Sequence, residues 1–234
     1  MLVISAHAAD FVWRAGGAIA LYHSHGCRVR VLCLSFGERG ESEKLWRQEG
    51  MSLERVKQVR RAEAERAADV LGAEIRFFDA GDYPLNPTRE LTEELVQEFR
   101  RVQPTIVLTH SLSDPYNGDH PTTARLTMDA RVYAQAAGYP SEFKKLGAPP
   151  VFLFEPHQPE MCEFKPQVLL DITPVFDIKR KAMECMEAQE HLWEYYTQLA
   201  LRRGVQGVRN SGNKAIKHAE AYQRVYPQVT SALA

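Results

Sequence analysis

The chain has 234 residues, of which 44% are hydrophobic and 25% are charged, a composition typical of a soluble globular protein. This excludes a disordered, collagen-like or disulfide-dense chain, and a chain of this length can bury a sizeable core. Because 29 Lys and Arg residues balance 30 Asp and Glu residues, giving a formal charge of −1, the basic face of a general nucleic-acid binder is not expected.

The cysteines and the first residues of the chain bear on its compartment. Cys27, Cys33, Cys162 and Cys185 form no C-x-x-C pair, so neither a thiolate zinc site nor a disulfide framework is expected. The start of the chain lacks a basic segment, and no stretch approaches the roughly 18 apolar residues that cross a bilayer. We therefore expect a cytoplasmic protein with neither nucleic-acid nor membrane partners.

Short apolar runs alternate with longer stretches of helical spacing. The strand-like runs are residues 2–6, 29–35, 75–78, 105–109, 151–154 and 168–172, and the helical stretches are residues 16–25, 53–71, 88–101, 121–137 and one long pattern over 174–204. Such alternation is typical of parallel βαβ units. We predict a single α/β domain over residues 1–234, with a Rossmann-like, mostly parallel sheet, helices on both faces and a helical C-terminal part.

Polar side chains follow five successive strand-like runs. In chain order they are His7 and Asp10; Glu38 and Glu41; Asp79 and Asp82; His110, Asp114, Asn117, Asp119 and His120; Glu155 and His157. Ligands of open parallel sheets bind beyond the carboxyl ends of the strands. The pattern therefore predicts a functional site at this edge of the sheet.

His7, Asp10 and His120 are candidate metal ligands. Two imidazoles and one carboxylate, with water in the remaining position, make an open catalytic zinc site. The alternative is that His7 is a buried, hydrogen-bonded histidine and Asp10 the N-cap of the following helix. Asp119 is either a carboxylate that orients a metal ligand or an N-cap beside Pro121.

A family resemblance follows from these motifs. His7-Ala8-Ala9-Asp10 with Gly16-Gly17, then Ser35-Phe36-Gly37-Glu38, Arg60-x-x-Glu63, Asp119-His120 and Ala219-Glu220-Ala221-Tyr222 together resemble the PIG-L/LmbE-like zinc deacetylases. The resemblance implies an LmbE-like fold, Zn²⁺ held by His7, Asp10 and His120, and a homo-oligomer, since relatives commonly assemble.

One position departs from that family. Its general base, the Asp before the zinc-binding Asp, is replaced by Ala9, which cannot carry a proton. Loss of a positioned general base costs about 10²–10⁴ in rate. An ordinary amide hydrolase is therefore disfavoured unless Asp119 or Glu38 substitutes for the missing acid.

A narrower resemblance accounts for this departure. Residues 5–14, 36–42, 114–120, 154–160 and 189–196 resemble the 4-oxalomesaconate hydratases of gallate degradation. This implies a hydro-lyase that adds water to a carbon–carbon double bond, giving 4-carboxy-4-hydroxy-2-oxoadipate. No amide nitrogen has to be protonated in that reaction, so the missing Asp is compatible with it.

Hydration requires proton transfer and recognition of three carboxylates. Glu38 and His157 are the candidates for proton transfer, with Asp119 a third; the alternatives are that Glu38 is a surface carboxylate and His157 a plain loop residue. Because guanidinium matches carboxylate geometry, arginines in or just after the implicated loops are candidate substrate ligands. Arg39 is the candidate from these loops, and Arg14 and Arg47 lie in the same regions. The family resemblance implies Arg60 as a second substrate-binding arginine, because it aligns with an arginine that contributes to substrate binding in the broader family. Tyr116 and Asn117 are candidate neutral donors.

Two other functions fit the same scaffold. A zinc-dependent deacetylase of N-acetyl amino-sugar conjugates would retain the family chemistry, and a non-catalytic ligand-binding relative would explain Ala9. A dinucleotide-binding fold is not favoured, because no G-x-G-x-x-G follows the first strand-like run.

Overall fold

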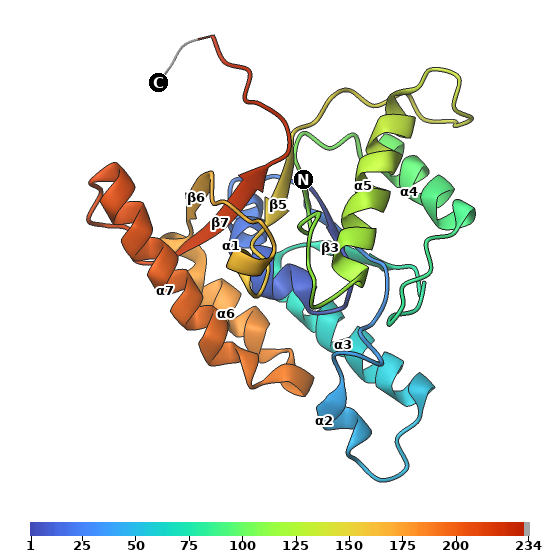
Figure 1. Ribbon diagram of the computed structural model, residues 1–234, viewed down its shortest axis with the longest axis horizontal. Helices are drawn as coiled ribbons and strands as arrows, with labels where there is room; N and C mark the ends of the chain where they lie inside the picture. The colour runs from blue at the N-terminus through green and yellow to red at the C-terminus, as the bar shows by residue number, and fades with distance from the viewer. Residues whose placement is uncertain (232–234) are drawn as a thin grey trace.

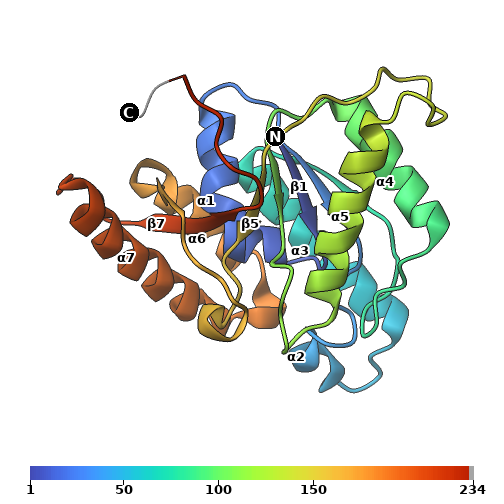
Figure 2. The same ribbon diagram turned by 45° about the horizontal axis from the view of Figure 1, so that its top comes forward.

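A computed structural model describes residues 1–231 and shows a sheet flanked by helices on both faces (Figure 1; Figure 2). The strands are β1 (Leu2–Ser5), β2 (Arg30–Cys33), β3 (Glu74–Phe77), β4 (Val107–Thr109), β5 (Val151–Phe154), β6 (Val168–Asp171) and β7 (Ala219–Arg224). The helices are α1 (Asp10–Ser24), α2 (Glu43–Trp46), α3 (Leu53–Leu71), α4 (Arg89–Val102), α5 (Asp119–Gln135), α6 (Phe176–Glu184) and α7 (Leu192–Ser211). Short 3₁₀ turns are η1 (Pro159–Met161), η2 (Thr173–Val175) and η3 (Glu187–Gln189).

The seven strands lie in the order β3-β2-β1-β4-β5-β7-β6. The first five are parallel, and β7 runs antiparallel between β5 and β6. The predicted α/β fold with a mostly parallel sheet is thereby confirmed. The strand order reverses between β1 and β4, which is the point where open sheets of this kind bind ligands.

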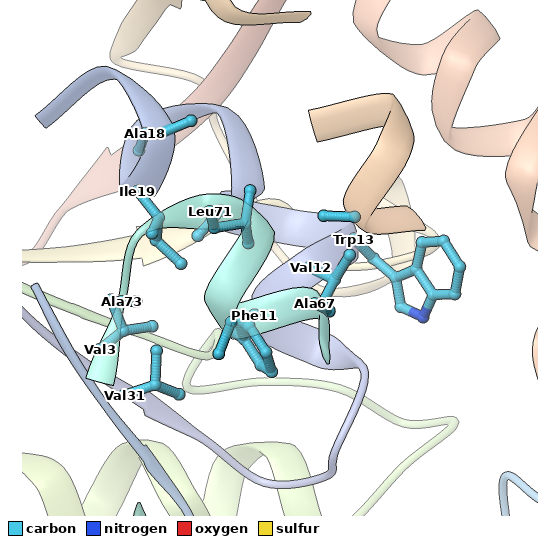
Figure 3. Close-up of a cluster of buried hydrophobic side chains, with 14 of the residues drawn as sticks. Val3, Phe11, Val12, Trp13, Ala18, Ile19, Val31, Ala67, Leu71 and Ala73 are labelled. Atoms are coloured by element: carbon cyan, nitrogen blue, oxygen red, sulfur yellow. The ribbon is translucent and has the colours of Figure 1, made fainter. Parts of the chain in front are cut away.

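The apolar residues form one core on each face of the sheet. Helices α1, α3 and α6 cover one face, where Val3 and Val31 of the sheet meet Phe11, Ile19 and Leu71 (Figure 3). Helices α4 and α5 pack against each other over the opposite face. Among the described helices, none is both long and apolar enough to cross a membrane.

Helix α3 has the local signals that its sequence predicts. The Ser52 hydroxyl accepts the Arg55 N–H at its start, a typical N-cap. At its end Gly72 adopts φ 74°, a left-handed conformation that glycine reaches without strain. A pair of such signals explains why the predicted and observed limits of this helix agree.

The strand β7 was not predicted from the sequence. Glu220 lies within it and is buried, so the strand lacks a continuous apolar face. Its carboxylate accepts the Gly17 N–H at 2.7 Å, the Ala18 N–H at 2.8 Å and the Lys179 ammonium at 2.6 Å. Partners that lie 41 to 203 positions away thus satisfy this buried carboxylate.

The prediction of one helix over residues 174–204 is wrong in its continuity. The segment contains α6, the turn η3 and the start of α7, which continues to Ser211. The break is held from outside: Glu63 accepts the Ala188 N–H at 2.8 Å, and Arg60 donates to the Gln189 side chain at 2.6 Å. Contacts from Arg60 and Glu63 of α3 therefore stabilise the break between α6 and α7, although no Gly or Pro occurs there.

Candidate functional site

Four side chains converge beyond the carboxyl ends of β1 and β2. His7 Nδ1 lies 3.2 Å from Asp10 Oδ2 and 3.2 Å from Glu41 Oε1, and His120 Nε2 lies 3.5 Å from Asp10 Oδ1. One ligand atom of each lies within 4.8 Å of the others. The structure thus brings together the three residues predicted as metal ligands and adds Glu41, which lies three residues after Glu38 in the same loop.

The cluster has the donor set and the charge that a divalent cation requires. His7 Nδ1, His120 Nε2 and Glu41 Oε2 are buried and have no hydrogen-bond partner among residues 1–231. Burial lowers the pKa of His7, but the charge of Glu41 and the close carboxylates of Asp10 and Asp119 raise it well above its usual range. A field that favours positive charge on His7 also favours a metal ion, and imidazole with carboxylate suits zinc.

Two carboxylates contact the imidazoles of the cluster on the side away from it. His120 Nδ1 lies 2.8 Å from Asp114 Oδ2, and His7 Nε2 lies 3.3 Å from Asp119 Oδ2. Burial raises the pKa of Asp119, but its contacts with His7 and with backbone N–H groups, including that of Tyr83, lower it to about 2. Both carboxylates therefore fix which ring nitrogen faces the cluster, a recurrent device of metal sites.

His110 is a further buried imidazole beside the cluster. Its Nε2 accepts the Ala6 N–H at 3.0 Å, and its ring stacks on His120 with centroids 4.2 Å apart. Burial and the neighbouring His120 lower its pKa to about 3, so it is neutral at pH 7. The ring therefore supports the backbone after β1 and the position of His120.

The cluster opens into a cavity of about 580 Å³, a size suited to a small-molecule ligand. His157, Tyr116 and Asn117, all predicted from sequence, line this cavity together with Glu41. The segment around η3 and the start of α7 closes another side, through residues Ala188, Gln189, Glu190, His191, Leu192 and Tyr196. Sequence analysis did not assign this C-terminal wall, because only tertiary packing brings it over the sheet edge.

The other predicted residues lie outside the cavity lining. The Glu38 carboxylate turns back and accepts the Phe36 N–H at 3.1 Å, and Asp119 lies behind His7. The Arg39 guanidinium donates to the Asp82 carbonyl at 3.0 Å. Arg60 is fully buried and donates to the Glu63 carboxylate at 2.6 Å. It also donates to the side chain of Gln189, which lines the cavity.

An α/β protein with an open sheet and a His-Asp-Glu-His cluster at its switch point is the class that the fold and the site define. Residues 2–131 match the model of the PIG-L family, described as GlcNAc-PI de-N-acetylase. The chain belongs to the PIG-L family.

Within that family, the chain is similar to hydratases. A 4-oxalmesaconate hydratase from Pseudomonas putida is 56% identical over all of this chain and 92% of the relative. The crystal structure of GalB, the 4-carboxy-2-hydroxymuconate hydratase from Pseudomonas putida KT2440, matches with a TM-score of 0.98, 56% identity, and coverage of 100% of this chain and 98% of that one.

Deacetylases of the family are more distant. A diacetylchitobiose deacetylase from Thermococcus kodakarensis is 28% identical over 89% of this chain and 82% of the relative. The N,N'-diacetylchitobiose deacetylase from Pyrococcus horikoshii shares the fold with a TM-score of 0.79 at 23% identity, covering 96% of this chain and 82% of that one.

Proposed function

We propose that this chain hydrates 4-oxalomesaconate in gallate degradation, adding water across the carbon–carbon double bond to give 4-carboxy-4-hydroxy-2-oxoadipate. The observation that carries this is 56% identity along the whole chain to a hydratase, whereas the deacetylase relatives share 28% or less. 4-Oxalomesaconate and 4-carboxy-2-hydroxymuconate are the keto and enol forms of one tricarboxylate, so the two similar hydratases agree on its carbon skeleton.

The residues fit a zinc ion. His7, Asp10 and His120 would hold it, with Glu41 beside them, because one ligand atom of each lies within 4.8 Å of the others. His7 Nδ1 and His120 Nε2 have no hydrogen-bond partner among residues 1–231. When bound, zinc lowers the pKa of water to about 7 or polarises a substrate oxygen. Asp114 and Asp119 serve this site by holding the two imidazoles.

Glu41 is the carboxylate best placed to accept a proton from water. It lines the cavity beside His7. Burial raises the pKa of Glu41, but the charge of His7 lowers it below its usual value, so the group is ionised at neutral pH. Glu38 stays a candidate from sequence, and variants of the two glutamates distinguish them.

His157 is the candidate for proton transfer at the neighbouring carbon. It lines the cavity and stacks on Tyr195, with ring centroids 4.2 Å apart. Burial and the charge of Arg14 lower its pKa, so the ring is neutral near pH 7. A neutral imidazole can accept a proton at one nitrogen and donate one from the other.

Ala9 supports hydration over deacetylation. It is fully buried at the start of α1, directly before Asp10. The methyl group can neither take a proton from water nor pass one to a leaving amine. Hydration has no leaving amine, so this side chain does not impede it.

An assay of purified protein separates the two activities. With zinc, loss of the enone absorbance of 4-oxalomesaconate supports hydration, whereas acetate release from an N-acetylated amino sugar supports the deacetylase. Hydration should disappear on chelation and return with zinc. Full activity of the metal-free protein would refute the proposed role of the cluster.

We also place the protein in the cytoplasm, as a homo-oligomer. The four cysteines are free thiols in the structure, as a reducing compartment favours. Light scattering of the purified chain measures its assembly state, and a monomer at working concentration would contradict this part of the proposal.

A further inference from the structure

Among the described residues that line the cavity, Lys44 and Arg47 are cationic side chains at its mouth, and Arg14 is the one Lys or Arg side chain that is buried. Lys44 and Arg47 are exposed by 47% and 75% of their side chains and pair with the surface carboxylates Glu190 and Glu43. The Arg14 side chain is only 6% exposed. Arg14 is therefore the guanidinium whose charge has lost most of its water.

Not all N–H donors of the Arg14 guanidinium make hydrogen bonds. Its Nη1 donates to the Glu155 carbonyl at 3.1 Å. Its Nε lies 3.4 Å from Asp10 Oδ1 and has no hydrogen-bond partner among residues 1–231. A buried charged group whose hydrogen bonds are not made destabilises the fold. A bound ligand that accepts hydrogen bonds from the Arg14 N–H groups offsets this cost.

The carboxylates near Arg14 are already committed to other groups. Arg203 donates to both carboxylate oxygens of Glu155, with Nε at 2.8 Å from Oε2. Asp10 faces both imidazoles of the cluster, with Oδ2 3.2 Å from His7 Nδ1 and Oδ1 3.5 Å from His120 Nε2, and is a candidate metal ligand. The carboxylate that pairs with Arg14, with Oδ1 3.4 Å from Nε, is thus one that Arg14 shares with the cluster. A buried cation is stabilised by an anion that it does not have to share.

The surroundings of Arg14 suit a carboxylate on a small organic molecule. Trp13 and Tyr196 line the same cavity and stack with ring centroids 5.3 Å apart, which forms an apolar wall beside the guanidinium. Figure 3 shows Trp13 directed away from Val3 and Val31 of the sheet. Four residues of helix separate Arg14 from Asp10, which corresponds to ~6 Å along the axis.

We propose that Arg14 binds a carboxylate of the substrate at a subsite about one helical turn from the metal cluster, and that it selects polyanionic substrates. This rests on the proposed hydratase function. Guanidinium pairs with carboxylate in a planar, two-bond geometry, and the low exposure strengthens that pairing relative to the mouth cations.

The test compares Arg14→Gln with Arg89→Gln, the same change at an exposed arginine of α4 that pairs with Glu93 and lies outside the lining of this cavity. Both proteins are loaded with zinc and their zinc content is measured. Calorimetry gives the Kd of propane-1,2,3-tricarboxylate, a non-reacting probe, and the hydration assay gives KM and kcat. For Arg14→Gln we expect Kd and KM to rise roughly 10- to 100-fold, with a smaller effect on kcat. For Arg89→Gln we expect a change of less than about threefold.

Arg14→Lys keeps the positive charge but not the planar fork. We expect the Kd and KM of Arg14→Lys to lie between those of the wild type and Arg14→Gln. If Arg14→Gln does not fold, the comparison of Arg14→Lys with the wild type tests the inference. Wild-type Kd and KM in both Arg14 variants would overturn the inference. A wild-type protein that binds the tricarboxylate through Arg14 but performs no hydration would instead refute the proposed function and leave the anion subsite standing.

Discussion

Replacing Glu41 by Gln removes the proposed proton acceptor of the cavity and preserves the shape of the side chain. In the structure the Glu41 Oε1 atom lies 3.2 Å from His7 Nδ1, and Oε2 has no hydrogen-bond partner among the described residues. Glu38→Gln is the matched control, since the Glu38 carboxylate accepts the Phe36 N–H and the amide oxygen of Gln can do the same.

The expected losses of kcat in the two variants differ by at least an order of magnitude. A positioned general base contributes about 10²–10⁴ in rate, which corresponds to about 3 to 5 kcal/mol of barrier height. We expect kcat of Glu41→Gln to fall by that factor. Glu38→Gln loses a charge outside the cavity lining, and we expect its kcat to stay within about threefold, the scale of a weak electrostatic change.

The assay follows enone absorbance in protein whose zinc content is measured for each variant. Because Glu41 also lies among the candidate ligands, rates are compared per bound zinc. Fully loaded Glu41→Gln with wild-type kcat would refute this assignment. A large loss in Glu38→Gln alone would return the role to the residue named from sequence.

Three further predictions concern the cluster and the fold. Ala9→Asp adds a carboxylate at a fully buried position beside Asp10, and we expect kcat for hydration to stay level or fall; an increase would contradict this account. Asp114→Ala leaves His120 Nδ1 without its 2.8 Å partner, so zinc affinity measured by chelator competition should fall about 10- to 100-fold, and unchanged affinity would be inconsistent. Burial raises the pKa of Glu98, but hydrogen bonds from Arg101 and Arg76 lower it below its usual value. Glu98→Gln should therefore cost about 1–2 kcal/mol of unfolding free energy at pH 7, and denaturant unfolding should show this difference shrinking as the pH falls below ~4.5; a difference that stays constant as the pH falls would refute the charge argument.

Much of the fold follows from local features of the sequence. The predicted strand over residues 2–6 and helix over residues 53–71 agree closely with β1 and α3, because apolar spacing and cap residues act within a few positions. His7, Asp10 and His120 could be selected for a related reason. Each directly follows a strand or begins a helix, and parallel strands bring their carboxyl ends to one edge.

Other features depend on contacts between distant segments. The strand β7 accommodates the buried Glu220 only because Gly17, Ala18 and Lys179 supply donors, and the turn before α7 exists because Glu63 holds the Ala188 N–H. No local pattern carries such information, since the partners lie from 41 to 203 positions away.

The choice between neighbouring glutamates has the same origin. Glu38 and Glu41 are chemically identical and three positions apart, so composition and spacing rank them equally. The loop that follows β2 turns one toward its own backbone and the other toward His7. Local sequence thus determined which kinds of groups meet at the sheet edge, whereas the folded loop decided which carboxylate faces the cavity, because side-chain direction in a loop depends on packing against the rest of the chain.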